Sequence, residues 1–445
     1  MRIGVSHVRA RAAFARLFTA VLQAVDPFTA LLREARIEKG TLLAGPHRYR
    51  LAQYRRVVAI GAGKAAARMA QGLEHILGAR LDTGLVVVKY GHGAPTNRVQ
   101  VIEAAHPVPD QAGLEAARRL LRIAGALTSD DLLIVLLSGG ASSLLPAPAN
   151  GLSLEDKQRA TQLLLGSGAT IQDMNTVRKH LSSLKGGQLA AATKASVLTL
   201  ALSDVIGDDL GTIGSGPTAP DNTTFSEAWA ILQRYGLGGT IPPSVRRHLL
   251  RGVRGRAEET PTSRSAVFKR VHHHIIGSNR AAVEAASRAA ARSGFETMVA
   301  SSTLTGEAKE VAKVFGAMAR EIAGCGRPLC RPCCLLAGGE LTVTVTGNGR
   351  GGRAQEFALA AAREIEGLRK IWIAGFATDG SDGPTDVAGA VVDGETVANA
   401  AHKGLDAARA LRQNDAHTFF KKAGGHIGTG PTGTNVNDLY LLLAL

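Results

Sequence analysis

The sequence has 445 residues, more than one hydrophobic core usually supports, so we expect two or three domains. Hydrophobic residues make up 45% of the chain and aromatic residues only 4%, a mixture typical of closely packed α/β layers. The 52 Lys and Arg residues outnumber the 37 Asp and Glu residues and give a net charge of +15. Because the basic residues are scattered and few aromatic side chains could stack on bases, the charge favours small anionic substrates over nucleic acid.

The N-terminus allows two interpretations. Residues 2–25 contain four arginines and no acid before Asp26, as in a transit peptide. Phe14, Leu17, Phe18 and Val21 recur at helical spacing, however, and this favours an amphipathic first helix that docks on the protein. No apolar run is long enough for a membrane-spanning helix. We therefore expect a cytoplasmic protein, and the sequence does not decide between a monomer and a homodimer.

In residues 1–250, apolar runs of strand length alternate with helical patterns. The runs are "RRVVAIGAG" from Arg55, "LVVVKYG" from Leu85, "DDLLIVLLSGG" from Asp130 and "ASVLTLALSD" from Ala195. This alternation predicts a mostly parallel sheet with ligands at the carboxyl ends of its strands.

Residues 251–266 lack apolar periodicity and are interpreted as a linker. A second α/β series follows in residues 267–445. It contains strand patterns in "VHHHIIGSN", "TMVASS", "LLAGGELTVTVTG", "IWIAGFATDG" and "NDLYLLLAL", and helical patterns near 280–293, 306–323 and 353–366. We therefore expect two α/β domains, 1–250 and 267–445.

Two glycine turns follow strands in the first domain. "IGAGKAA" contains Gly61, Gly63 and Lys64 in the form G-x-G-x-x-A, which suggests a dinucleotide site. That site needs an acid at the end of the next strand, where this chain has Lys89. Lys64 better suits a phosphate or carboxylate, although a solvated lysine in the first helical turn stays an alternative.

The second turn, "LLSGGASS", contains Ser138, Gly139, Gly140 and Ser142. A nucleophile elbow needs G-x-S-x-G, and no glycine precedes Ser138 at the required place. We therefore interpret this turn as an anion-binding turn.

The segment "TVTVTGNGRGGRAQEF" places Arg350 and Arg353 where a strand passes into a helix. Surface turns often have this composition. Alternatively, the backbone N–H groups and dipole of a helix start attract an anion, and arginine adds a bidentate clamp.

Carboxylates also follow the predicted strands. Asp204, Asp208 and Asp209 come after one buried strand, and Asp379 and Asp382 follow another. A carboxylate at a strand end can act as a general base or bind Mg²⁺, whereas turn capping is the simpler role for Asp208 and Asp209. Cations at glycine turns together with carboxylates at strand ends suit phosphoryl transfer from ATP.

All four cysteines lie within "CGRPLCRPCC", from Cys325 to Cys334. The Cys-x-x-Cys spacing is that of a zinc site. Cys333 and Cys334 are adjacent, however, and one short linker rarely closes a tetrahedron alone. Reduced thiols without a ligand are the expectation.

Over nearly its whole length the chain resembles the glycerate 2-kinase family, whose C-terminal module is the MOFRL domain. The resemblance rests on "IGAGKAA", "LLSGGASSLL", "NTVRKHLSSLKGGQLA", "ALSDVIGDDLGTIGSGPTAPD", "IIGSN", "GGELTVTVTGNGRGGRAQEFALA", "ATDGSDGPTDVAGA" and "GTGPTGTNVND". It implies a larger Rossmann-like three-layer domain, a smaller α/β domain and a substrate cleft between them. It also implies phosphorylation of D-glycerate on its 2-hydroxyl, with ATP and Mg²⁺.

The catalytic residues implied by the resemblance are Lys64, Asp204 and Arg353. Mg²⁺ is expected at Asp204 and Asp209. The residues expected to bind substrate or nucleotide are Gly61, Gly63, Ser138, Gly139, Gly140, Ser142, Asn175, Arg178, Lys185, Gly339, Glu340, Gly349, Gly351, Gly352, Asp379 and Asp382.

Two positions depart from the family pattern. Ala354 stands where the family usually has Asn, so a ligand contact could be lost, and Gly214 stands where the family usually has Ala. The alternative function is an NAD(P)H-dependent hydroxypyruvate reductase, a name often given to such chains.

Overall fold

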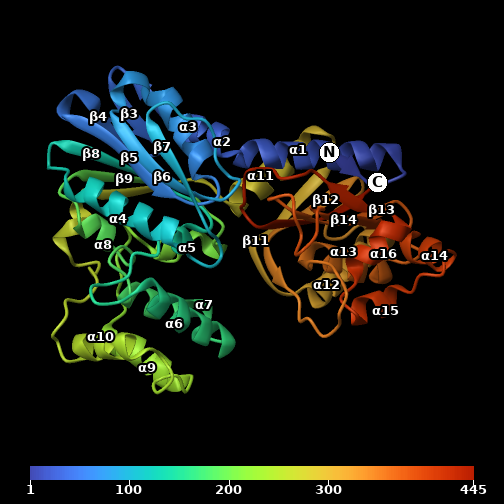
Figure 1. Ribbon diagram of the computed structural model, residues 1–445. Helices are drawn as coiled ribbons and strands as arrows, with labels where there is room; N and C mark the ends of the chain where they lie inside the picture. Colours follow the sequence, from blue (N-terminus) through green and yellow to red (C-terminus); the bar gives the residue numbers. More distant parts are fainter. The chain divides into compact units, whose positions relative to one another are not determined.

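The computed structural model describes all 445 residues and divides into two compact units. Residues 27–276 form one of them, here called the inserted unit; residues 1–26 and 277–445 form the other, the terminal unit (Figure 1). This division differs from the expected 1–250 and 267–445. The first 26 residues join the C-terminal part, and residues 251–276 stay with the part that precedes them.

The inserted unit is built on a six-stranded sheet with the order β10-β9-β8-β5-β6-β7. Its strands are β5 (Arg56–Ala62), β6 (Thr83–Lys89), β7 (Val99–Ala104), β8 (Asp131–Leu137), β9 (Ser196–Leu202) and β10 (Val271–Gly277). Strands β5 to β9 pair in parallel throughout, as the alternating sequence pattern predicted.

The strand order reverses at the middle of this sheet. From β5 the chain moves outward through β6 and β7, then returns to place β8 and β9 on the other side of β5. The connections after β5 and β8 therefore leave in opposite directions. In open parallel sheets, this reversal creates the crevice in which ligands bind.

Helices cover both faces of the sheet (Figure 1). Helices α4 (Gln111–Gly125), α5 (Ala141–Leu144) and α8 (Gln188–Ala191) share one buried core with the strands. Helices α2 (Pro27–Glu34) and α3 (Ala66–Leu77) pack together on the opposite face. The inserted unit is thus the expected three-layer α/β structure.

Two parts of this unit lie outside the three layers. Helices α6 (Leu154–Gly166), α7 (Ile171–His180), α9 (Phe225–Arg234) and α10 (Pro243–Val253) pack around a core of their own. Strands β2 (Ala35–Glu38), β3 (Thr41–Ala44) and β4 (His47–Arg50) form a small antiparallel sheet that the sequence analysis did not predict. Short 3₁₀ turns occur at Leu51–Gln53, Gly78–Arg80, Ile206–Asp208, Ile213–Ser215 and Ala266–Arg270.

The terminal unit contains a seven-stranded sheet with the order β1-β15-β14-β13-β16-β12-β11. Its strands are β1 (Arg2–Ile3), β11 (Glu296–Glu307), β12 (Cys333–Thr342), β13 (Ile371–Ala377), β14 (Gly389–Asp393), β15 (His426–Gly428) and β16 (Asp438–Ala444). Only β11 and β12 pair in parallel. Strand β12 ends at Thr342, so the Thr-Val alternation that follows is an exposed loop rather than the expected continuation of the strand.

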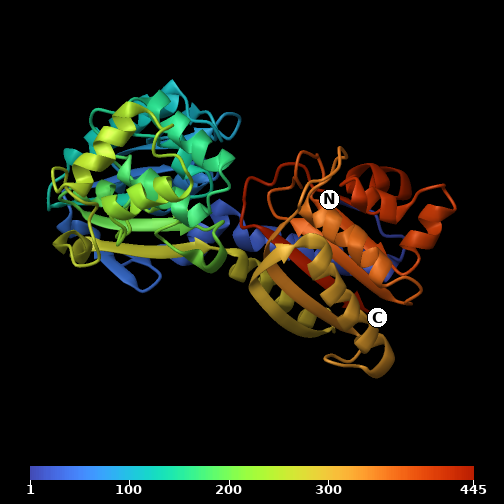
Figure 2. The ribbon, with the colours of Figure 1, turned by 90° about the horizontal axis from the view of Figure 1, so that it is seen from below.

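This sheet also lies between two helical layers, as Figures 1 and 2 show. One layer contains α12 (Ala308–Cys325), α13 (Arg353–Glu364), α14 (Thr396–Ala401), α15 (Ala407–Arg412) and α16 (Ala416–Ala423). The other contains α1 (Val8–Val25), which packs along α11 (Asn279–Arg292).

The first helix explains the unexpected unit boundary. Phe14, Leu17, Phe18 and Val21 of α1 are all fully buried, which confirms the amphipathic helix predicted from their spacing. The ring of Phe18 stacks on that of Phe376 in β13, with 4.3 Å between their centroids. No single helix of the chain has the length and apolarity needed to cross a membrane, although α1 and α2 pass that test jointly as a bent pair.

Candidate active site

The site begins where β5 and β8 end side by side. A Cβ atom on Gly61 would lie 2.1 Å from the carbonyl oxygen of Leu136 in β8, so no larger residue fits there. Gly63 has a φ of +133°, and a Cβ atom on it would lie 2.1 Å from the Ser138 hydroxyl oxygen. The two glycines therefore let the turn after β5 press directly against the turn after β8.

Hydrogen bonds lock these turns together. The Lys64 backbone N–H donates to the Gly139 carbonyl oxygen at 2.8 Å, and the Ala65 N–H donates to the Ser138 hydroxyl oxygen at 3.0 Å. Ser138 is buried. Its hydroxyl thus holds the start of α3 in place.

Lys64 and Asp204 flank the Gly139-Gly140 dipeptide. A Cβ atom on Gly139 would lie 2.1 Å from Oδ2 of Asp204, which follows β9. A Cβ atom on Gly140 would lie 3.7 Å from Cγ of Lys64. The structure therefore gathers a cation, a carboxylate and a glycine turn, all predicted from sequence, at the reversal point of the parallel sheet.

His106 is a neighbour of this cluster that the sequence analysis missed. Its Cδ2 atom lies 2.9 Å from where a Gly140 Cβ would be. Burial, then the charge of Lys64, lower the pKa of His106 to about 4, so its imidazole is neutral at pH 7. It can supply a hydrogen bond beside Lys64 without adding charge. Its position two residues after the end of β7, at Ala104, is the feature of the sequence that could have pointed to it.

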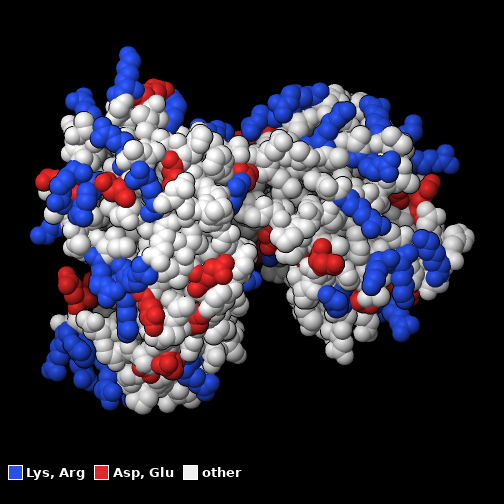
Figure 3. Space-filling view, turned by 45° about the horizontal axis from the view of Figure 1, so that its top comes forward, with Lys and Arg blue, Asp and Glu red and all other residues white.

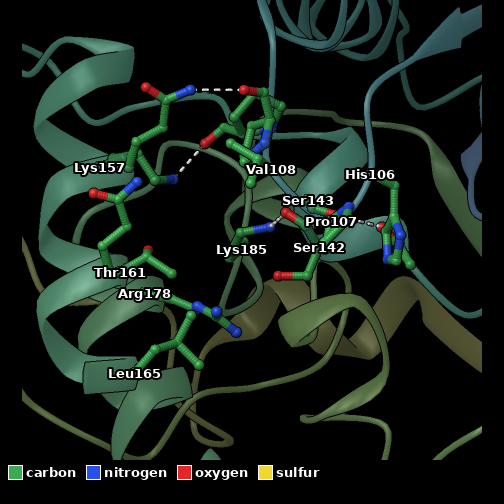
Figure 4. Close-up of a pocket in the computed structure, with 15 residues that line it drawn as sticks. His106, Pro107, Val108, Ser142, Ser143, Lys157, Thr161, Leu165, Arg178 and Lys185 are labelled. Carbon is green, nitrogen blue, oxygen red and sulfur yellow. Dashed lines mark hydrogen bonds between the residues drawn. The ribbon is translucent and has the colours of Figure 1, made fainter. Parts of the chain in front are cut away.

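Ser142 and Asn175, both predicted, are joined by a residue that was not. The hydroxyls of Ser142 and Ser215 lie 2.9 Å apart, and the Ser215 hydroxyl donates to Oδ1 of Asn175 at 3.2 Å. Ser142 also lines a cavity of about 370 Å³ together with Arg178 and Lys185 (Figure 4). Ser142, Arg178 and Lys185 therefore border one cavity, which Gly140 also lines, whereas Asn175 is linked to it through Ser215 and does not line it.

Asp209 has a different setting from Asp204. Its Oδ1 accepts the Gly211 N–H at 3.3 Å, and its Oδ2 accepts the Thr212 hydroxyl at 2.5 Å. These bonds stabilise its own turn, in the capping role that the sequence analysis considered as the simpler one.

In the terminal unit, Arg353 is the first residue of α13 and is surrounded by carboxylates. Its guanidinium donates to both oxygens of Asp438, and its Nη1 atom pairs with Glu340. Asp438 is buried and also accepts the Tyr440 hydroxyl at 3.0 Å. Burial raises the pKa of Asp438 to about 7, with Arg353 acting in the opposite direction. Asp438 was not predicted, because nothing near it in sequence indicates an arginine partner.

The start of α13 already holds an anion. Asp382 is buried, and its carboxylate accepts the backbone N–H groups of Ala354 at 3.0 Å and Gln355 at 2.8 Å. A Cβ atom on Gly352 would lie 2.3 Å from the same carboxylate. Asp382 therefore occupies the anion position that the sequence analysis considered for a ligand.

The other predicted residues of this unit make local contacts. Asp379 accepts the Ser381 N–H at 3.0 Å, the Gly349 N–H donates to the Gln413 carbonyl oxygen at 2.9 Å, and Gly351 packs beside Ala416. Gly339 lies within β12 next to Leu304.

Comparison with known proteins relates the chain to one family. Residues 13–250 match the profile described as "Domain of unknown function (DUF4147)", and residues 333–438 match the MOFRL family. A glycerate 2-kinase of Pyrococcus horikoshii is 42% identical over 96% of each chain. The chain belongs to the glycerate 2-kinase family.

A solved structure supports the same family. The crystal structure of glycerate kinase from Thermotoga maritima, 38% identical, matches with a TM-score of 0.87 over 98% of this chain and 100% of its own. A relative from Agrobacterium vitis, 39% identical over 98% of this chain and 95% of its own, carries a provisional hydroxypyruvate reductase name. The family and the α/β fold class predicted from sequence are confirmed.

The departure at Ala354 lies in the core of the terminal unit. Ala354 is fully buried, and its backbone lies 2.4 Å from where a Gly375 Cβ would be. Its own Cβ lies 3.3 Å from where a Gly389 Cβ would be. An alanine fits this tight contact with two glycines.

The cysteines and histidines form no metal cluster. Cys325 and Cys330 are exposed, Cys333 and Cys334 are buried in β12, and all four thiols are free. No three His, Cys, Asp or Glu side chains are grouped to hold a metal ion.

Proposed function

We propose that the protein is a glycerate 2-kinase, which transfers the γ-phosphoryl group of ATP to the 2-hydroxyl of D-glycerate and releases 2-phosphoglycerate and ADP. The observation that carries this proposal is the proximity of Asp204 to Gly139 and of Lys64 to Gly140, in one turn at the reversal of the parallel sheet. Relatives that match this chain over nearly their full length are named glycerate kinases. The cytoplasm, which supplies ATP, is the proposed location.

Each residue of the cluster has a role in this reaction. Asp204 orients the 2-hydroxyl and accepts its proton as the new P–O bond forms. Lys64 places a positive charge beside the transferring phosphoryl group or the glycerate carboxylate, where negative charge must be stabilised. Both act by position and charge, because phosphoryl transfer needs little covalent chemistry from the protein.

Arg353 is assigned to the same reaction by the family resemblance alone. It belongs to the terminal unit, where Asp438 and Glu340 hold its guanidinium in a fixed orientation. These carboxylates use three of the five N–H donors of the guanidinium, so the remaining two can bind a carboxylate or phosphate.

Mg²⁺ is the metal expected with ATP, and Asp204 is the residue that would hold it. Mg²⁺ commonly uses only one or two protein carboxylates and takes its other ligands from water and phosphate. A single carboxylate at a glycine turn therefore fits this ion, which would neutralise charge on the phosphate oxygens.

The two alternatives find less support. A dinucleotide site after β5 would need a carboxylate at the end of β6, and β6 ends with Lys89. For nucleic acid, a continuous basic face is expected, whereas the face drawn in Figure 3 shows Lys and Arg side chains separated by uncharged surface and by some acidic side chains.

The direct test is to incubate the purified protein with ATP, Mg²⁺ and D-glycerate and to identify the product by ³¹P NMR. The expected product is 2-phosphoglycerate, formed together with an equal amount of ADP. Formation of 3-phosphoglycerate would refute the proposed position of transfer. NADH oxidation with hydroxypyruvate, without ATP consumption in the presence of D-glycerate, would support the reductase instead.

A further inference from the structure

The cavity lined in part by Gly140 has basic side chains in its lining and no acidic ones. It lies between the loop after β7, helices α6 and α7 and the segment that follows α7, and its volume of about 370 Å³ is that of a small-molecule site (Figure 4). Lys157 of α6, Arg178 of α7 and Lys185 converge on it. No aspartate or glutamate lines it.

The three cations keep donors free for a ligand. Lys185 donates to the carbonyl oxygens of Ser142 at 2.6 Å and Leu145 at 3.3 Å, and Lys157 donates to that of Pro146. Each ammonium has three donors, so at least one on Lys185 and two on Lys157 stay unused. The Arg178 guanidinium makes no hydrogen bond or ion pair within the protein.

Burying three basic side chains close together costs free energy when no anion is bound between them. Lys157 and Lys185 are buried, and together with Arg178 they repel one another in a space of low polarity. Burial, and then the charge of Arg178, lower the pKa of Lys157 to about 7; burial, together with the charges of Lys157 and Arg178, also lowers the pKa of Lys185. A ligand with several negative charges would remove the repulsion and supply the missing acceptors, whereas one carboxylate could satisfy only part of the set.

The rest of the cavity lining is mostly apolar, with a few amide side chains. Val108 and Leu165, each more than half exposed, border the cavity together with prolines of the loop after β7. Gln162 of α6 also lines it and makes no hydrogen bond in the protein. Apolar surface with a few amide groups suits the flat face and polar edge of a nucleobase.

We propose that this cavity is the nucleotide subsite, in which Lys157, Arg178 and Lys185 bind the phosphate chain and the lining that includes Val108 and Leu165 contacts the base. The inference rests on the proposed kinase activity. Gly140 belongs both to this cavity and to the turn beside Lys64, so the phosphate chain reaches the catalytic cluster there. D-Glycerate then binds beside Lys64 and Asp204, outside the cavity.

Calorimetric titration of the full-length protein with two probes tests this assignment. The first is a non-hydrolysable ATP analogue with Mg²⁺, and the second is inorganic tripolyphosphate, which lacks the base. Arg178→Met and Lys157→Met are each expected to weaken binding of both probes by at least about 10-fold. Val108→Ser and Leu165→Ser are expected to weaken binding of the analogue alone. Arg159→Met, an exposed position on the same helix outside the cavity, is the matched control and should change neither affinity.

Steady-state kinetics separates the two ligands. The Arg178→Met enzyme should show a raised KM for ATP and a KM for D-glycerate within about 3-fold of the wild type. If its affinity for the ATP analogue is unchanged, or only the KM for D-glycerate rises, the assignment is overturned while the kinase activity stands. If the serine variants bind the analogue normally, the position of the base is refuted. A wild-type protein that binds the analogue in this cavity but yields no phosphoglycerate would refute the proposed function instead.

Discussion

Gly139→Ala is a small substitution that separates catalysis from folding. The added Cβ would lie 2.1 Å from Oδ2 of Asp204, and such contacts are essentially never shorter than 3.0 Å, so the carboxylate must retreat by at least 0.9 Å. Gly139 has no positive φ, and the atom displaced is the end of a side chain, so the backbone can stay in place. A displacement of about 1 Å at a reacting group costs on the order of 100-fold in rate. The cost in stability should stay below about 1 kcal/mol.

The assay for this variant is kcat with D-glycerate and ATP, measured alongside the thermal midpoint. Gly166→Ala is the control, because no atom lies within 4 Å of its added Cβ at the end of α6. It should keep wild-type kcat and a thermal midpoint equal to or above that of the wild type. A Gly139→Ala enzyme with kcat within about 3-fold of the wild type would show that the position of Asp204 does not matter for the reaction.

Three further changes test other parts of the argument. Lys64→Met should lower kcat by about 10²–10³-fold with an unchanged circular dichroism spectrum, and near-normal turnover would remove Lys64 from the mechanism. Asp438→Asn should lower the free energy of unfolding of the terminal unit by about 2 kcal/mol. This is less than the loss expected for a fully buried ion pair, because the Arg353 side chain is 31% exposed and keeps its ion pair with Glu340. Urea titration followed by Trp372 fluorescence in a Trp229→Phe background reports that unit alone, and an unchanged midpoint would contradict the pair's role. For His106, whose pKa is lowered from 6.5 to about 4, the stability that its neutral form contributes is present above pH 6.5 and is lost as the pH falls toward 4. His106→Gln should therefore flatten the dependence of the thermal midpoint on pH between 4 and 6.5, and an unchanged slope would argue against this linkage.

The local pattern of apolar runs and glycine turns was sufficient to predict most strands of the inserted unit and the turns that follow two of them. Strands β5, β6, β8 and β9 lie where apolar runs predicted them, and the turns after β5 and β8 contain the glycines that let the two turns touch. Parallel pairing then brings the ends of these strands to one edge, so Lys64 and Asp204 could be expected together.

What local pattern could not show is the choice of partner over long distances in sequence. The anion at the start of α13 is Asp382, which lies 28 residues after Ala354, and the partner of Arg353 is Asp438, which lies 85 residues after it. Lys157 resembles any helical lysine in sequence, and only the fold reveals that it is buried beside two other cations.

The same limit applied to the unit boundary. The spacing of Phe14, Leu17 and Phe18 identified a helix with one apolar face, but not the core that this face joins. That choice depends on Phe376 and α11, more than 250 residues further along the chain.

The docking of α1 has a consequence for biosynthesis. Residues 27–276 are contiguous, so this unit can fold on the ribosome as soon as it has emerged. The terminal unit has to wait, because α1 is made first, whereas β16, in the middle of its sheet, ends at residue 444. The nascent chain therefore carries an amphipathic helix without the core it packs against through almost the whole of translation.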